Sequence, residues 1–404
     1  MRLLAFAGGL FLLFNFFVGA GSQAEGVVGG YGYRISDLFA LGCVLLLIFT
    51  ANSPAKFASV LWYGLACACV VLPLLVTRDR QTATLALHFS LYSLAGLFMA
   101  MMFSRGYATA FAWGMLAGLA ATVATFALLH AGIPLATLAS LGLAAGYAGD
   151  FGGYVREMPR YSGLWGHPNE ASHVAALASA AAAYLLLVDK SKLAAFIATA
   201  GLLAVFYYTL SRGGLMIGGA IVALAFFLKG GMGPKFQLAV LSVVACLSVA
   251  ALFPELTARF SDMAGAEANF TERLDSVLTT VQIISAHPFG QSITDFENEL
   301  GRKTLTVTSP HNGFFFTAAV LGVPALLILL LVMGSNLLAY RQSPFLALLC
   351  LQVAGSFLFE QMSGNRSYVF AIGIIIGGAY LRSRLGTPLL HGTLFRNPGS
   401  LAAN

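Results

Sequence analysis

Long apolar runs that lack charged residues recur along almost the whole chain. A helix needs about 20 mostly apolar residues to cross the hydrocarbon core of a bilayer, and these runs approach that length. Charged residues make up only 9% of the chain, whereas soluble domains carry about 25%. The sequence therefore predicts an all-α polytopic membrane protein in which residues 1–404 form a single transmembrane domain. About twelve transmembrane helices are expected, at residues 3–20, 36–52, 57–76, 82–103, 107–130, 170–188, 193–210, 214–228, 236–253, 313–333, 343–360 and 367–381.

Two apolar segments allow a second interpretation. The first span resembles a signal peptide, with small residues at 18–20, but only Arg2 supplies the positive charge that such a peptide needs. An uncleaved helix is therefore favoured, and residue 21 lies on the same side of the membrane in both cases. Residues 131–147 are apolar but interrupted by glycine, which predicts an interfacial or re-entrant segment.

The longest hydrophilic loop is expected at residues 254–312, between the ninth and tenth spans. Within it, the stretch RLDSVLTTVQII carries apolar residues at helical spacing, at Leu274, Val277, Leu278, Val281 and Ile284. A helix that is apolar on one side suits the surface of a bilayer. The sequence therefore predicts a helix that lies on the membrane within this loop.

The distribution of lysine and arginine predicts the orientation of the chain. Short cytoplasmic loops of membrane proteins are enriched in these residues. With the N-terminus inside, eleven positive charges and the single acid Asp189 lie on the inner side, and the remaining eleven positive charges and fifteen acids lie outside. Both termini are thus expected in the cytoplasm. The pI of about 9.1 follows from this topology, so nothing indicates binding to nucleic acid.

Several arginine and histidine residues fall on the outer side, where topology disfavours positive charge. Most of them belong to four motifs: RYSGLWGHPN at 160–169, SRGG at 211–214, the loop stretch TERLDSVLTTVQIISAHPFGQ, and SPHNGFFFTAAVLG at 309–322. Arg366 lies apart from these, in MSGNRSY. Asn169 is placed to cap the helix that follows it, and a capped helix start offers N–H groups to an anion. The candidate residues are Arg160, His167, Asn169, Arg212, Arg273, His311, Asn312 and Arg366.

The residue types in these motifs point to phosphate chemistry. The planar guanidinium of arginine donates two parallel charge-assisted hydrogen bonds to phosphate and keeps its charge. Histidine titrates near neutral pH and is able to accept a proton from a hydroxyl group. Arginines and a histidine at a membrane interface therefore predict group transfer from a lipid diphosphate to an alcohol.

Other interpretations compete for some of these residues. Arg366 is either a third phosphate contact or an interfacial anchor, with Glu360 placed to neutralise it. His167 and His287 precede prolines and are more typical of turns, while His173, one turn into a helix, is typical of a packed core. No histidine or acidic pair has the close spacing of a metal site, and the five cysteines all fall inside predicted spans. No metal or cofactor is expected.

The four motifs together resemble those of the O-antigen ligase and polysaccharide polymerase family. RYSGLWGHPN is similar to the family's R-x-x-G-x-x-x-x-P-N signature, SRGG to its second arginine motif, and AHPFGQSITDF followed by HNGFF to its periplasmic loop and His-Asn pair. The resemblance covers mainly residues 155–330, with the motifs in the family's order. The first 150 residues match only as a set of spans.

This resemblance implies a GT-C-like helical glycosyltransferase of the bacterial inner membrane, active at the periplasmic face without a divalent metal. Arg160 and Arg212 would hold the diphosphate of an undecaprenyl-diphosphate-linked glycan, His311 would act on the acceptor hydroxyl, and Arg273 is a looser match that would join the arginines. The acceptor is either lipid A-core, for a ligase, or another repeat unit, for a polymerase. A transporter or flippase is the alternative of another class. Ionisable groups near the membrane midplane are typical of transporters, whereas the candidates here gather at one interface.

Overall fold

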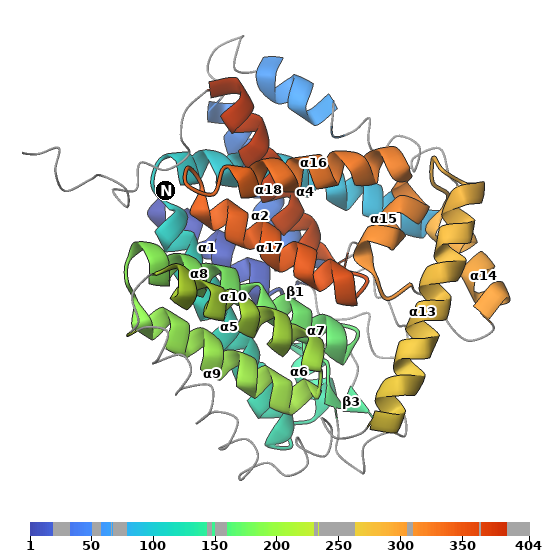
Figure 1. The fold of residues 1–404 in the computed structure, drawn as a ribbon. Helices are drawn as coiled ribbons and strands as arrows, with labels where there is room; N and C mark the ends of the chain where they lie inside the picture. The colour runs from blue at the N-terminus through green and yellow to red at the C-terminus, as the bar shows by residue number, and fades with distance from the viewer. Residues whose placement is uncertain are drawn as a thin grey trace, which may run out of the picture.

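The computed structural model describes residues 1–18, 33–50, 58–65, 67, 79–143, 148–149, 160–229, 233, 263–304, 310–362 and 365–385. Helices dominate these residues, and two pairs of two-residue antiparallel strands accompany them (Figure 1). The elements of the first half are α1 (Arg2–Leu13), β1 (Phe17–Val18), β2 (Tyr33–Arg34), α2 (Ile35–Thr50), α4 (Arg80–Ser104), α5 (Ala108–His130), α6 (Leu135–Ser140), β3 (Ala148–Gly149), β4 (Arg160–Tyr161), α7 (Pro168–Ala176) and α8 (Ala178–Val188). Those of the second half are α9 (Lys192–Thr209), α10 (Arg212–Leu228), α13 (Met263–Ala286), α14 (Ile293–Thr304), α15 (Gly313–Leu321), α16 (Val323–Leu338), α17 (Pro344–Phe359) and α18 (Arg366–Leu385).

The predicted all-α membrane protein is confirmed. Within the described residues, four helical segments are long and apolar enough to cross a membrane: Gln81–Ser104, Ala108–His130, Pro168–Val188 and Lys192–Thr209. Five shorter apolar helices accompany them, among them α2, α10 and α17. Large apolar side chains such as Phe196, Leu331 and Leu338 point outward and are 69%, 73% and 92% exposed. Exposure of this kind suits contact with lipid.

Some predicted spans differ from the observed helices. The helix expected at 3–20 ends at Leu13. The helix expected over 313–333 is wrong as a single element, because the chain breaks at Gly322 between α15 and α16. Gly322 has φ 88°, a backbone conformation that suits glycine and ends the helix.

Other expected elements lie partly or wholly outside the described part. The predicted span at 236–253 is outside the described residues, and that at 57–76 is described only at 58–65 and 67. The exact number of spans and the single-domain organisation therefore stay predictions. Residues 131–147 form only the short helix α6 in their described portion.

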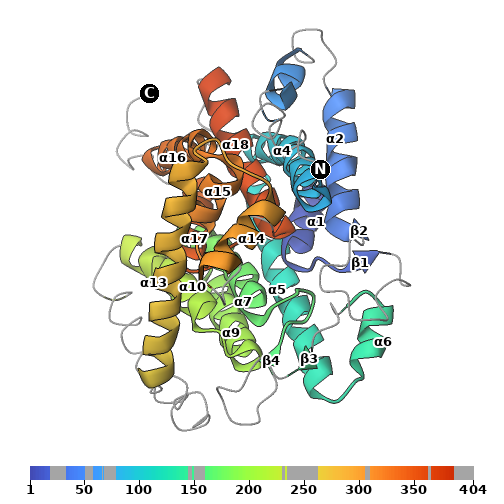
Figure 2. The same ribbon diagram turned by 90° about the vertical axis from the view of Figure 1, so that its right-hand side faces the viewer.

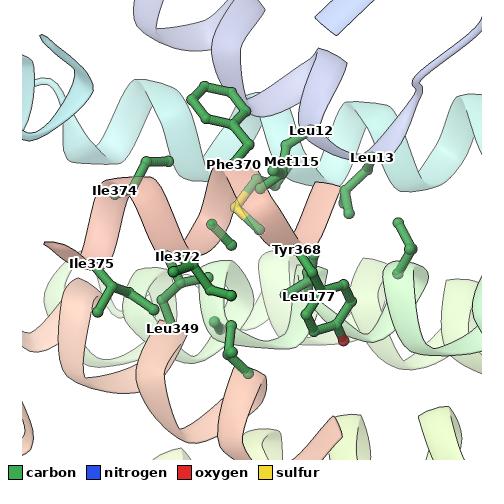
Figure 3. Close-up of a cluster of buried hydrophobic side chains, with 14 of the residues drawn as sticks. Leu12, Leu13, Met115, Leu177, Leu349, Tyr368, Phe370, Ile372, Ile374 and Ile375 are labelled. Carbon is green, nitrogen blue, oxygen red and sulfur yellow. The ribbon is translucent and has the colours of Figure 1, made fainter. Parts of the chain in front are cut away.

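The core lies where helices distant in the sequence meet. Side chains of α1, α5, α17 and α18 gather there around Phe370, Met115 and Leu349, together with Leu177 at the junction of α7 and α8 (Figure 3). α4 packs along α18, and α1 packs along α5. α1, α4 and α5 thus form one continuous core with the later helices.

The long loop is helical in its described part. α13 runs crosswise to α9 and α16 (Figure 1), and the start of α14 is bound to the start of α4. There Thr82 Oγ1 accepts the Ile293 N–H at 2.9 Å. The predicted helix at RLDSVLTTVQII is confirmed, and Leu274, Leu278 and Val281 of its apolar face are exposed.

Lysines gather at one end of α9. Lys190 and Lys192 lie beside Lys229 at the end of α10, and burial together with these two charges lowers the pKa of Lys229. Thr209 ends α9, and a helix of 18 residues is about 27 Å long. The lysine end and the Thr209 end therefore lie on opposite sides of a membrane-thick bundle.

Candidate functional site

The candidate motifs converge at the Thr209 end of the bundle. The segment before α7, the α9–α10 junction, α13, the start of α15 and the end of α17 all meet there (Figure 2). Hydrogen bonds join Arg160, Asn169, Glu360 and His311 into a chain, which we call the His311 cluster.

Arg160 links the first motif to the second. Its Nε donates to the Thr209 carbonyl at 2.8 Å, and its Nη2 donates to Asn169 Oδ1 at 3.1 Å. Because Thr209 ends α9 and Arg212 begins α10 three residues later, this bond holds the two arginine motifs side by side.

The cap of α7 differs from the expectation. His167, rather than Asn169, is the N-cap, and its Nδ1 accepts the N–H of Asn169 at 3.1 Å. Burial lowers the pKa of His167, partly opposed by Glu360, so the neutral ring that can accept this bond is favoured. The Asn169 side chain is thereby available to bridge Arg160 and Glu360. The prediction that Asn169 caps the helix is wrong, and His167, which was expected in a turn, is the cap instead.

Close packing positions the SRGG motif against α7. Ser172 Oγ donates to the Ser211 carbonyl at 3.2 Å. A Cβ atom on Gly214 would lie 2.2 Å from Ser172 Oγ, so only glycine permits this approach. Leu210, immediately before the motif, has φ 52°, a conformation that is uncommon and costly for a branched residue.

His311 also has an unusual backbone, with φ 46°. A non-glycine residue in this region costs about 1–3 kcal/mol and tends to occur at functional sites. Asn312 next to it caps α15, with Oδ1 accepting the N–H groups of Phe314 and Phe315 at 3.0 and 3.1 Å. The His311 side chain is 30% exposed, and its Nδ1 lies 3.3 Å from Glu360 Oε1.

Glu360 was not expected to be part of the site. It follows the last residue of α17, and its side chain is 13% exposed. Burial alone would raise the pKa of this carboxyl, but the bond to His311 and the charge of nearby Arg273 help to lower it to about 2. Asn169 Nδ2 donates to its second oxygen at 3.2 Å. The only hint in the sequence was a lone acid at the end of a span.

Arg273 reaches the same place from α13. Its Nη1 donates to the carbonyl of Phe359 at 2.8 Å, one residue before Glu360. Ser276, Thr280 and Ile283, one or more turns along α13, are buried against the bundle. The inner face of α13 therefore carries Arg273 toward the His311 cluster while its outer face carries the exposed leucines.

Arg366 belongs to a different set of contacts. Its Nη1 lies 2.8 Å from Asp37 Oδ2, so the expected pairing of Arg366 with Glu360 is wrong. Tyr92 donates to the other Asp37 oxygen at 2.6 Å and also bonds to Ser36. We call Ser36, Asp37, Tyr92 and Arg366 the Asp37 cluster. It adjoins the His311 cluster, because Asn365 donates to Glu170, the neighbour of Asn169.

His173 and His287 lie outside the chain of hydrogen bonds of the His311 cluster. His173 is 2% exposed within α7, as expected of a packed residue. His287 begins a turn whose carbonyl accepts the Gly290 N–H at 3.0 Å, and its ring lies 3.7 Å from Glu299. In the described part of the chain, no three His, Cys, Asp or Glu residues are grouped to hold a metal ion.

The comparison with protein families now decides the relationship. Residues 195–330 match the family model of the O-antigen ligase. This segment is similar to the O-antigen ligase domain. It extends from within α9 to within α16 and contains Arg212, Arg273 and His311, while Arg160 and Glu360 lie on either side of it. No curated protein matches the chain.

This match supports the resemblance to the O-antigen ligase and polymerase family seen in the motifs. It indicates a membrane-bound glycosyltransferase of the ligase or polymerase type. Such an enzyme needs a lipid-linked glycan donor and an acceptor.

Proposed function

We propose that this protein is an O-antigen ligase-type glycosyltransferase of the bacterial inner membrane. It moves an oligosaccharide or polysaccharide from undecaprenyl diphosphate to a sugar hydroxyl at the periplasmic face. The observation that carries the proposal is the convergence of Arg160, His311 and the start of α10 at the end of the bundle opposite the lysines.

The diphosphate is held by Arg160, Arg212 and Arg273. These three cations come from separate elements, and Glu360 and Glu170 are the nearby acids in the described residues. Both acids keep their negative charge, and Glu170 accepts hydrogen bonds from the N–H of Gly166 and the amide of Asn365. Three guanidinium groups therefore face two carboxylates. The positive charge that remains suits a diphosphate, whose negative charge grows as it leaves the sugar.

His311 accepts the proton of the acceptor hydroxyl. The acceptor oxygen then forms a bond to the anomeric carbon, and the bond from that carbon to the diphosphate oxygen breaks. The bonding electron pair leaves with the diphosphate, where the arginines stabilise it. A single displacement of this kind inverts the anomeric centre.

The hydrocarbon chain of the carrier binds in an apolar cavity beside the site. The cavity has a volume of about 470 Å³ and is lined by Phe316 and Thr317 of α15, Val332 of α16 and Ile376 of α18, among others. α15 begins two residues after His311, so the cavity wall lies about one helical turn from the proposed base. A polyprenyl chain in this cavity would leave its diphosphate at the arginines.

Deletion of the gene tests the proposal and separates its two forms. Surface glycans are then examined on a gel. Bare lipid A-core with accumulated lipid-linked glycan supports a ligase, whereas single capped units support the alternative, a polymerase. Long chains that remain on the carrier at the cytoplasmic face would instead support a flippase and contradict both.

A further inference from the structure

Glu360 holds a buried carboxylate between two partners that lie far apart in the sequence. Oε1 lies 3.3 Å from His311 Nδ1, and the Gln361 N–H also donates to Oε1 at 3.3 Å. Oε2 accepts from Asn169 Nδ2 at 3.2 Å. Because both oxygens have partners from different elements, the carboxylate has one well-defined orientation.

This orientation decides which nitrogen of His311 is the base. An ionised carboxylate only accepts hydrogen bonds, so the His311 nitrogen that faces it, Nδ1, carries the proton. The lone pair of the neutral ring is then on Nε2. A backbone with φ 46° adds a second constraint on the direction of this ring.

We propose that Glu360 is the positioning residue of His311, which fixes the imidazole with Nε2 toward the acceptor and stabilises the imidazolium that forms. This inference rests on the proposed function, in which His311 takes the proton of the acceptor hydroxyl. In that step the O–H bond breaks and the proton passes to Nε2, while Nδ1–H stays bonded to Glu360. The positive charge of the ring then lies beside the carboxylate.

Asn169 joins this pair to the diphosphate-binding arginine. The amide accepts from Arg160 and donates to Glu360, so it separates the two charges by one neutral group. A direct Arg160–Glu360 pair would neutralise the carboxylate that His311 needs. The intervening amide therefore separates Arg160 from Glu360 and leaves the carboxylate in contact with His311.

Other charged groups face the pair from the elements packed around it. Arg160 and His167 come from the segment before α7, His173 from α7 itself, and Arg273 from α13. All of these are cationic or become so on protonation. Glu360 is the acid in contact with His311.

The test compares Glu360→Gln with the wild-type protein, both purified and assayed for glycan transfer from a lipid-diphosphate donor. Glutamine keeps the shape but loses the charge. We expect kcat to fall on the order of 10²-fold with little change in the donor KM. We also expect activity to persist to lower pH on the acid side, because a lost carboxylate makes the imidazole harder to protonate.

Glu299→Gln is the matched control, because Glu299 also lies beside a histidine, His287, outside the site. It should leave kcat and the pH profile unchanged. A wild-type kcat and pH profile in Glu360→Gln would overturn the inference. If Glu360→Gln does not accumulate, Glu360→Asp keeps the charge but shortens the reach to His311. A reduced kcat in that variant supports the inference, and a wild-type kcat overturns it.

His311→Ala separates this inference from the proposed function. An inactive His311→Ala with a normal Glu360→Gln would remove only the role of Glu360. A fully active His311→Ala would remove the proposed base itself.

Discussion

The His311 cluster and the Asp37 cluster are neighbouring networks with different charge arrangements. In the Asp37 cluster, Arg366 and Asp37 are in direct contact at 2.8 Å. Tyr92 and the Arg34 N–H also donate to Asp37, and His88 lies 3.8 Å from it. In the His311 cluster, a neutral amide separates Arg160 from Glu360.

The difference indicates which network takes part in the transfer reaction. In a buried charge pair in direct contact each charge compensates the other, and removal of one partner leaves an uncompensated buried charge. An arginine separated from the acid, beside two more arginines and a histidine with φ 46°, is arranged for a group that arrives later. We therefore expect changes in the Asp37 cluster to affect folding and changes in the His311 cluster to affect transfer.

The largest effect on transfer is expected from His311→Ala. Loss of a general base reduces the rate by about 10²–10⁴-fold. Membrane abundance should not change, because the His311 side chain is 30% exposed and its removal leaves no large cavity. Transfer per molecule of membrane protein is the measurement, with His287→Ala as the control in an exposed turn. Equal loss in both variants would contradict the assignment.

Arg160→Lys should have the second-largest effect on transfer. Lysine keeps the charge but loses the planar fork that bonds to Thr209, Asn169 and phosphate together. We expect kcat to fall on the order of 10²-fold. Arg302→Lys serves as the control, because Arg302 is an exposed residue of α14. Comparable activity in the two variants would show that Arg160 is only an anchor.

Asp37→Asn should reduce the stability of the protein rather than its transfer activity. Breaking a buried ion pair by removing one partner costs about 3–5 kcal/mol. We expect lower membrane abundance and a lower thermal midpoint, with normal transfer per folded molecule. Asp275→Asn on the exposed side of α13 is the control. A stable Asp37→Asn protein without activity would place the Asp37 cluster in the site and erase the contrast.

A smaller effect is expected from filling the apolar cavity. Val332→Trp should raise the donor KM several-fold and leave kcat almost unchanged, because the larger side chain fills part of the cavity that holds the carrier chain. Leu338→Trp is the control, since Leu338 is 92% exposed and lies outside the cavity lining. An identical KM in both variants would remove the cavity from donor binding.

The smallest effect is a pH dependence of stability. The contacts of Glu360 lower its pKa to about 2, whereas glutamate usually titrates near 4.3. The stability that the carboxylate contributes is therefore present above about pH 4.3 and is lost as pH falls toward about 2. The thermal midpoints of wild type and Glu360→Gln should converge over this interval. A gap that widens with acid would contradict the sign.

Much of the fold and the motifs could be predicted from the sequence. Apolar run length gave the helices, and charge on the disfavoured side of the membrane gave Arg160, Arg212, Arg273 and His311. Glu360 was missed because an acid at a span end has no local pattern, and its partner His311 lies 49 residues away. The Asp37–Arg366 pair spans 329 residues, so only the packing of α2 against α4, and of α4 against α18, reveals it.

Two local errors have equally physical causes. Asn169 is not the cap because α7 begins before it, at Pro168, and His167 Nδ1 accepts the N–H of Asn169. The break at Gly322 was not predicted because the residues on both sides are apolar. Hydropathy carries no information about the positive φ of this glycine.

The central claim is that the arginines bind the diphosphate while His311 acts on the acceptor. Donor binding and transfer, measured on the same purified His311→Ala and Arg160→Lys proteins with undecaprenyl-diphosphate glycan, test it most directly. The account predicts that His311→Ala binds the donor as tightly as wild type but forms no product, and that Arg160→Lys binds it more weakly. Normal transfer by His311→Ala would contradict the account. Wild-type donor affinity in Arg160→Lys would contradict it as well.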